Sequence, residues 1–258
     1  MISVWLTVPD EYRDRVIAEL WEAGTTGITE EGDVLRAFFE SEIDLGQFAQ
    51  FQPRASLEDE HDWVKESQDQ WEPFAVGERF FLVPEWRDDP APAGRIRLTM
   101  HPGLACGSGT HPATRLGLMG LEKHLSPADR VLDVGTGSGI LAVAARLLGA
   151  ECVFGCDIEH DATEVARGNF IKDRVVVPVF TGSLRSVRAS SIDVVVANLN
   201  RVTLEYLRED LRRVLRIGGL LIASGFREDE MDGLACDWQI VEKMELDDWG
   251  GLILSALR

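Results

Sequence analysis

Residues 130–142 read Arg130-Val-Leu-Asp-Val-Gly-Thr-Gly-Ser-Gly-Ile-Leu-Ala142, and this stretch decides the fold. The apolar, β-branched residues up to Val134 predict a strand, and the apolar residues from Ile140 to Leu148 recur at helical spacing. The glycines between them permit a tight turn and a close approach of a ligand to the backbone. Strand, glycine turn and helix form the first unit of a doubly wound nucleotide-binding domain, whose helix N-terminus offers free N–H groups to ligand oxygens.

Two cofactors fit this stretch. Read from Gly137, it matches the dinucleotide fingerprint, with Asp157 following about 20 residues later. Read from Asp133, it is Asp-x-Gly-x-Gly-x-Gly, the pattern of S-adenosylmethionine (AdoMet) enzymes. A carboxylate at Asp133 would repel the pyrophosphate of NAD but would suit the ammonium group of AdoMet. The sequence therefore favours AdoMet, with an NAD-dependent oxidoreductase as the alternative.

The acidic composition of the chain bears on its partners. The 258 residues carry a formal net charge of −18, with a pI near 4.6. This charge disfavours nucleic acid and anionic membranes as partners and suits a basic protein. The four cysteines form no Cys-x-x-Cys pair, so no metal site or redox motif is indicated, and their use fits a reducing cytoplasm. Without a signal segment or a membrane-spanning apolar run, we expect a cytoplasmic protein.

Strand and helix patterns alternate from Asp129 onward, which predicts an α/β fold with a parallel sheet. The expected strands are 131–134, 152–158, 175–180, 192–198 and 220–224, and the expected helices are 112–124, 138–148, 161–170 and 203–215. Residues 239–246 and 251–257 are expected to add a closing hairpin. The seven-stranded, Rossmann-like methyltransferase sheet has such a hairpin, whereas a simple dinucleotide fold lacks it.

The N-terminal part of the chain has a different pattern. Residues 2–39 predict a β-α-β-β module, and the acidic residues 41–60 predict an irregular linker. A connecting helix is expected within residues 62–74, followed by strands at 79–83 and 95–100. The expected organisation is a small α+β domain over 1–56, a linker of helix and strands over 57–100, and an AdoMet domain over 101–258.

Ligands of open α/β sheets bind beyond the carboxyl ends of the strands. The candidate cofactor contacts are Asp133, Gly135, Gly137, Asp157, Ile158, Ser183 and Asn198, with Thr114 at the start of a covering helix. Asp157 can accept both ribose hydroxyls, Ser183 can line the adenine, and Asn198 can present its carbonyl to substrate or cofactor. Helix capping by Asp157 and plain turn roles for the other two are the alternatives. Cys106 and His111 lack the spacing of a nucleophile and its base.

Several segments resemble the bacterial ribosomal protein L11 methyltransferase family. They are 104–115, 131–142 and 196–199, with further matches at Asp62-Trp63, 76–79 and 83–86. The resemblance implies an N-terminal substrate-recognition domain, a linker and a C-terminal AdoMet domain. It also implies trimethylation of lysine side chains and of the N-terminal amine of L11, with S-adenosylhomocysteine as product. The implied AdoMet contacts are Thr114, Gly135, Asp157 and Asn198.

The chain departs from this family at three places. Cys106 replaces an aromatic residue, Ser108 replaces a threonine, and no second helix and strand is expected after Phe39. A methyltransferase of the same fold with another acceptor, and a noncatalytic AdoMet sensor, therefore stay as alternatives. The expected chemistry is direct methyl transfer to a neutral amine, with Asn198 positioning the reactants and no dedicated base.

Overall fold

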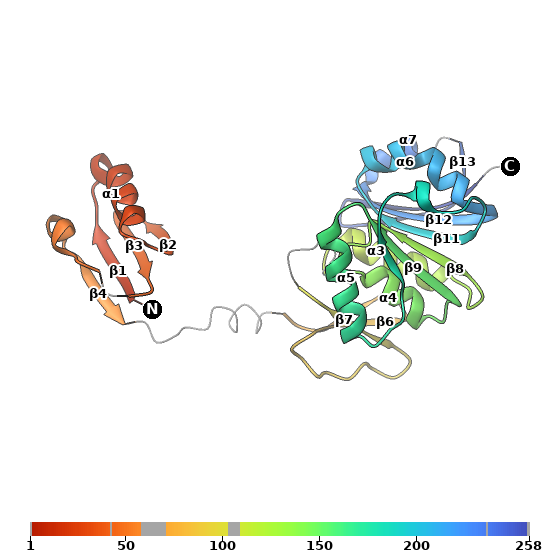
Figure 1. The fold of residues 1–258 in the computed structure, drawn as a ribbon, viewed down its shortest axis with the longest axis horizontal. Coiled ribbons are helices and arrows are strands. Elements are labelled where there is room, and N and C mark those ends of the chain that lie inside the picture. Colours follow the sequence, from red (N-terminus) through yellow and green to blue (C-terminus); the bar gives the residue numbers. More distant parts are fainter. Residues whose placement is uncertain (1, 42, 58–70, 103–108, 236, 257–258) are drawn as a thin grey trace. The chain divides into compact units, whose positions relative to one another are not determined.

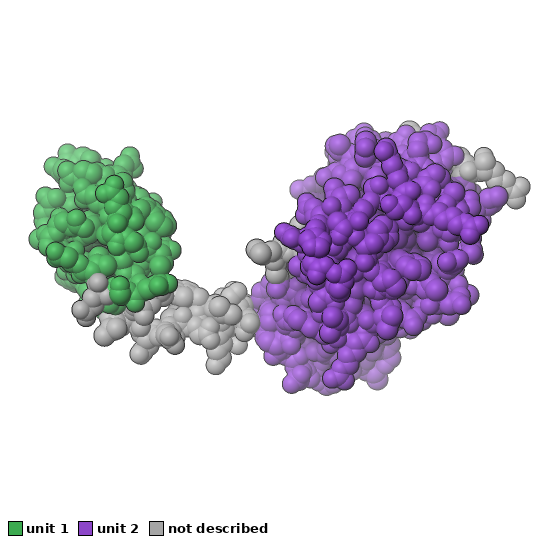
Figure 2. Space-filling model, viewed as in Figure 1, with its two compact units in different colours: residues 1–70 green, residues 71–258 purple. Residues whose placement is uncertain are grey.

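The computed structural model describes residues 2–41, 43–57, 71–102, 109–235 and 237–256. The chain forms two compact units, residues 1–70 and 71–258 (Figures 1 and 2). Residues 62–70 of the predicted connecting helix, and Cys106 and Ser108, lie outside the described residues. The described end of that prediction, residues 71–74, is not helical, because Phe74 begins β5. Residues 71–100 of the predicted linker form strands of the second unit, and the functional division at residues 56 and 100 stays a prediction.

In its described residues, the first unit is a four-stranded antiparallel sheet with the helix α1. Its elements are β1 (Ile2–Thr7), α1 (Asp10–Glu22), β2 (Gly27–Glu31), β3 (Val34–Phe39), the 3₁₀ turn η1 (Gly46–Phe51) and β4 (Arg54–Leu57), with strand order β2-β3-β1-β4. Alternate residues of β1 and β3, such as Leu6 and Leu35, pack on Val16 and Leu20 of α1 and on Phe48 of η1. The predicted β-α-β-β module is confirmed.

The prediction of an irregular linker over residues 41–60 is wrong for residues 54–57, which form β4. This strand pairs antiparallel with β1, placing Ala55 opposite Val4 and Arg54 opposite Trp5. Its residues 54–56 are exposed and show no apolar alternation. The strand therefore depends on backbone pairing with β1, which the local sequence pattern does not reveal.

The second unit contains the predicted seven-stranded sheet, in the order β10-β9-β8-β11-β12-β14-β13. The strands are β8 (Arg130–Val134), β9 (Cys152–Asp157), β10 (Val179–Thr181), β11 (Ile192–Asn198), β12 (Leu215–Arg227), β13 (Trp238–Leu246) and β14 (Trp249–Ala256). The first five of these run parallel, and β14 pairs antiparallel with β12 and β13. The Rossmann-like α/β fold and the closing hairpin are confirmed. β10 begins after the predicted start, and β12 extends the predicted 220–224 strand at both ends.

Helices cover both faces of this sheet (Figure 1). They are α3 (Pro112–His124), α4 (Ile140–Leu147), α5 (His160–Lys172), α6 (Arg201–Val214) and α7 (Met231–Leu234), with the short turns η2 (Leu184–Ser186) and η3 (Glu228–Glu230). Val194 and Val196 of β11 belong to the core with α3, α4 and α5, and Val195 and Ala197 belong to the core with α6 and α7. Because both faces are buried, the central strand is apolar at successive positions.

Helix α3 lies unusually close to the sheet. Its Gly120 faces Ile222 of β12, and a Cβ built on Gly120 would lie 2.6 Å from Ile222 Cγ2. Since real Cβ atoms do not approach other atoms this closely, only glycine permits this packing depth. None of the helices in the described part of the chain has the length and apolar character needed to cross a bilayer.

A small sheet of β5 (Phe74–Val76), β6 (Phe80–Pro84) and β7 (Ile96–Met100) completes the second unit. A group that we call the His101 clamp, made of His101, Glu85, Asp173 and Lys172, joins this sheet to the end of α5. His101 Nδ1 lies 3.0 Å from Glu85 Oε2, His101 Nε2 lies 3.1 Å from Asp173 Oδ1, and Lys172 donates to Glu85 Oε2 at 2.8 Å. Burial alone would lower the pKa of His101, but the bonds to the two carboxylates outweigh it and raise the pKa.

Candidate functional site

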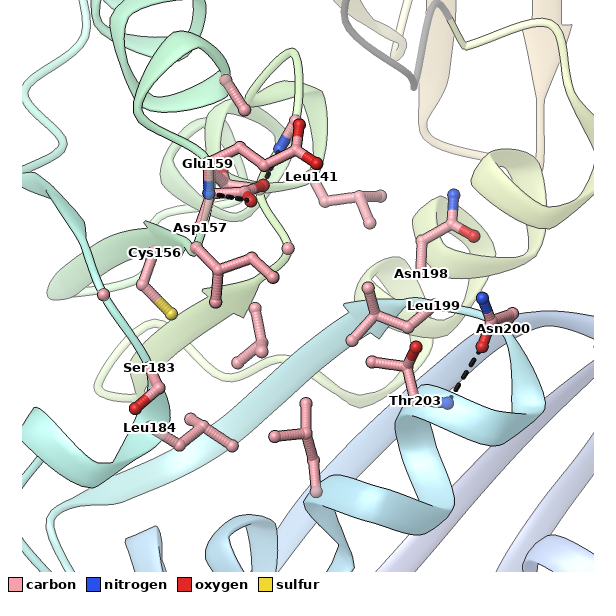
Figure 3. A pocket seen from close by; sticks show the side chains of 18 of the residues that line it. Leu141, Cys156, Asp157, Glu159, Ser183, Leu184, Asn198, Leu199, Asn200 and Thr203 are labelled. Atoms are coloured by element: carbon pink, nitrogen blue, oxygen red, sulfur yellow. Dashed lines mark hydrogen bonds between the residues drawn. The ribbon is translucent and has the colours of Figure 1, made fainter.

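A cavity of about 520 Å³ opens at the carboxyl ends of β8, β9 and β11 and beside the turn after β10. This volume falls in the usual range of small-molecule sites. Figure 3 shows Asp157 and Glu159 on one side of the cavity and Asn198, Leu199 and Asn200 on the other. The cavity therefore lies at the sheet edge that the sequence predicts.

The glycine turn after β8 forms one wall of the cavity. Gly135 has φ +69°, in the left-handed region, and a Cβ built on it would lie 2.5 Å from Leu199 Cδ2. Gly137 also lines the cavity, and the turn leads directly into α4. Because no side chain fits at Gly135, the backbone of the turn is kept available to a ligand.

The Asp157 carboxylate ends β9 and is held by two backbone amides. Its Oδ2 accepts a hydrogen bond from Gly137 N at 3.1 Å, and its Oδ1 accepts one from Glu159 N at 3.1 Å. Each oxygen can accept a further hydrogen bond. Neighbouring Ile158 also lines the cavity and is 77% exposed, so it presents an apolar surface to a ligand.

Asn198 and Thr114 meet at the opposite wall. Asn198 Nδ2 at the end of β11 donates to Thr114 Oγ1 in the first turn of α3 at 3.1 Å. Ser183 lines the cavity below Asp157, beside Leu184 (Figure 3). Thr114, Gly135, Gly137, Asp157, Ile158, Ser183 and Asn198 of the predicted set are thus brought together around one cavity.

Asp133 is the predicted contact that the structure does not bring to the cavity. Its side chain is 1% exposed, accepts hydrogen bonds from Thr136 Oγ1 at 2.8 Å and Ala142 N at 3.2 Å, and is not among the lining residues. Burial, with a smaller contribution from the charge of Asp157, raises its pKa to about 7. The expected contact with an ammonium group is therefore corrected: Asp133 fixes the glycine turn to α4 from inside.

Sequence reasoning missed several lining residues that come from the start of α5, from η2, and from the end of β11 through the first half of α6. They are Glu159, Ala162, Leu184, Leu199, Asn200, Thr203 and Leu207. Asn200 caps α6, because its side chain accepts a hydrogen bond from Thr203 N at 2.9 Å. The position of Asn200, two residues after the end of β11 and just before a helical pattern, is the signal that would have found this part of the wall.

An aromatic group lies at the same edge of the sheet, where α3 and β14 begin and β12 ends. The rings of His111 and Trp249 are 4.4 Å apart in an edge-on arrangement, and the Arg227 guanidinium lies 4.7 Å from the Trp249 ring centroid. His111 also caps α3, since its Nδ1 accepts from Ala113 N at 3.2 Å. Aromatic rings held in this way can bind cationic side chains. No group of three or more His, Cys, Asp or Glu within the described ranges is placed to hold a metal ion.

Comparisons with known proteins agree on one family. A family model described as ribosomal protein L11 methyltransferase (PrmA) matches residues 9–256. A ribosomal protein L11 methyltransferase of Cupriavidus necator is 42% identical over 177 residues, covering 69% of this chain and 58% of that protein. A Listeria monocytogenes protein of the same name is 32% identical over 256 residues, covering 95% of this chain and 81% of its own length.

A solved structure gives the same result for the fold. The crystal structure of a ribosomal protein L11 methylase from Lactobacillus delbrueckii subsp. bulgaricus is similar with a TM-score of 0.67 and 30% sequence identity, covering 73% of this chain and 100% of that one. The matched region spans 58% of the length of the Cupriavidus necator protein and 59% of a relative from Cupriavidus taiwanensis, which is less than two thirds of each.

Proposed function

The chain belongs to the ribosomal protein L11 methyltransferase family, and on this premise we propose that it methylates amines of ribosomal protein L11 with AdoMet as methyl donor. The observation that carries the proposal is the pairing of two features across one cavity. The Asp157 carboxylate faces the Asn198–Thr114 hydrogen bond, with the glycine turn between them. An acidic acceptor of hydroxyl groups and a polar wall of donors suit the two ends of an amino-acid nucleoside.

The residues around the cavity fit AdoMet. Asp157 would accept the ribose hydroxyls, Ile158 and Leu184 would enclose the adenine beside Ser183, and Gly135 and Gly137 would offer backbone groups. Thr114, in the first turn of α3, would hold the amino-acid end together with Asn198. When bound, AdoMet supplies a methyl group activated by a sulfonium.

The work left to the protein is to align an acceptor amine and to keep it neutral. The apolar lining, including Val134 and Leu199, disfavours an ammonium group and favours its neutral form. The Asn198 amide can accept a hydrogen bond from the incoming amine, and Trp249 with His111 forms an aromatic wall at the same sheet edge. We assign no dedicated base.

The acceptor is proposed to be a basic protein. The net charge of −18 favours approach of a lysine-rich partner, an effect that salt screens. Methylation of a ribosomal protein implies action in the cytoplasm, and recognition of that protein is assigned to the first unit. Nucleic acid and membrane are not proposed as partners.

Transfer of labelled methyl groups from AdoMet to purified L11 tests the proposal, with mass spectrometry to count and locate the methyl groups. At limiting AdoMet, we expect labelled L11 with wild-type protein, strongly reduced labelling with Asp157→Ala, and normal labelling with Asp161→Ala, an exposed position on α5 outside the cavity. Labelling of a different protein in cell lysate, with none on L11, would support a same-fold enzyme with another acceptor. Calorimetric binding of NAD but not AdoMet would support an oxidoreductase instead.

A further inference from the structure

Ser224 of β12 carries a buried hydroxyl without a hydrogen-bond partner. Its residue exposure is 1%, and Oγ forms no hydrogen bond with any atom of the residues that the structure describes. Buried hydroxyls are nearly always bonded, because an unpaired one loses its hydrogen bonds to water without replacement. Alanine would fill almost the same space without this cost. We therefore look for a hydrogen bond that this hydroxyl forms only when a ligand is bound.

Ser224 lies beside the wall of the cavity that Asn198 and Thr114 form. Ser224 pairs with Asn198 in the parallel register of β11 and β12, so their side chains point to the same face of the sheet. A Cβ built on Gly117 of α3 would lie 3.6 Å from Ser224 Oγ, which places the hydroxyl under this helix. Thr114 lies one turn earlier on the same face of α3, where its Oγ1 accepts from Asn198.

The side chains of Thr114, Asn198 and Ser224 do not pair all of their hydrogen-bond donors and acceptors with one another. Thr114 Oγ1 has two lone pairs and accepts one hydrogen bond, from Asn198 Nδ2. Ser224 has a proton to donate and no acceptor. An Asn198 amide that turns toward a ligand would vacate the threonine oxygen. Ser224 is the neighbouring donor that can replace it.

We propose that Ser224 is a positioning residue of the cofactor site: when AdoMet binds and draws the Asn198 amide toward the cavity, the Ser224 hydroxyl donates to Thr114 Oγ1 and keeps Thr114 in place. This inference rests on the proposed function. Ser224 is buried and is not among the lining residues, so it acts through Thr114 and does not touch the ligand. The exchange makes and breaks hydrogen bonds only.

The test is Ser224→Ala in the full chain, measured by calorimetric titration with AdoMet and by thermal melting with and without AdoMet. AdoMet should shift one of the thermal unfolding transitions. Without ligand, we expect the melting temperature of that transition to rise by about 2–6 °C, because an unpaired hydroxyl has been removed. With ligand, we expect AdoMet to bind about 3- to 10-fold more weakly, because one hydrogen bond of the complex is lost. A purely structural residue would not change stability and affinity in this opposed way.

Two further variants support the comparison. Ser224→Cys keeps a similar size with a weaker donor, so its affinity should fall between those of wild type and Ser224→Ala. Ser3→Ala is the control, because it removes another buried serine. Ser3 lies in the first unit, is 0% exposed and already has an interaction partner. Its affinity for AdoMet should equal that of wild type.

AdoMet affinity of Ser224→Ala within twofold of wild type would overturn the proposal, and so would a lower melting temperature without ligand. Either result leaves methyl transfer by the wild-type protein intact. Failure of the wild-type protein to bind AdoMet would instead reject the proposed function together with this role.

Discussion

The cavity wall and the His101 clamp both gather polar side chains in the second unit, yet they use them in opposite ways. In the clamp, both ring nitrogens of His101 face carboxylates, and Lys172 also bonds Glu85. At the cavity, the Asp157 oxygens accept one backbone hydrogen bond each, and Ser224, buried beside the cavity wall, forms no side-chain hydrogen bond within the described residues. Satisfied polar groups stabilise a fold, whereas groups with remaining hydrogen-bonding capacity are available to a further partner, which is a ligand for Asp157 and Thr114 for Ser224. Substitutions in the two regions should therefore separate stability from binding.

Asp157→Ala should give the largest effect. Two charge-assisted hydrogen bonds to the ribose would be lost, which corresponds to a weakening of AdoMet binding by about 100-fold or more. Titration calorimetry measures this change, and Asp161→Ala is the matched control. Binding within threefold of wild type would remove Asp157 from the ligand contacts.

His101→Ala should mainly reduce stability. It leaves the buried Asp173 carboxylate, which is 9% exposed, without its partner. Loss of one partner of a largely buried ion pair costs about 3 kcal/mol, or about 5–10 °C in melting temperature for a unit of this size. AdoMet affinity should stay within threefold of wild type. A large loss of affinity at unchanged melting temperature would show that the clamp belongs to the site.

The clamp should also make stability depend on pH. The pKa of His101 is raised in the folded state, so its contribution is fully present below the ordinary histidine pKa of about 6.5 and is lost as pH rises through the folded value. Chemical denaturation from pH 6 to 9 should show falling stability in wild type and a flatter profile in His101→Gln. Identical slopes for the two proteins would contradict this assignment.

Asp133→Asn should give the smallest effect. The folded pKa of Asp133, about 7, exceeds the ordinary value of 3.8, so the folded state binds the proton more tightly. Stability should consequently fall as pH rises from about 4 to 7, and the amide should weaken that fall while still accepting from Thr136. Denaturation between pH 4 and 8 checks this. A steeper profile in the variant would mean that the carboxylate is stabilised as the anion.

The sequence predicts the sheet and its ligand edge because the strands of the second unit are strongly patterned. Asp157 is the last residue of β9 and turns to the cavity, whereas Asp133 precedes Val134 within β8 and stays in the pleat, pointing toward the start of α4. The AdoMet pattern contains Asp133 and the dinucleotide fingerprint contains Asp157, and neither pattern tells which carboxylate reaches the cavity. The contact of His111 with Trp249 joins residues 138 positions apart, and β4 depends on pairing with β1, so neither is visible in a local pattern.

The absence of a side chain at Gly120 has a consequence for the cavity two turns away. Thr114 is carried by the same helix, so the depth at which Gly120 rests on Ile222 fixes the height of the Thr114 hydroxyl above the sheet. Because α3 is one continuous helix, its distance from the sheet at Gly120 determines the position of Thr114 in its first turn. A larger side chain at Gly120, which lies outside the cavity, should therefore change the affinity for AdoMet.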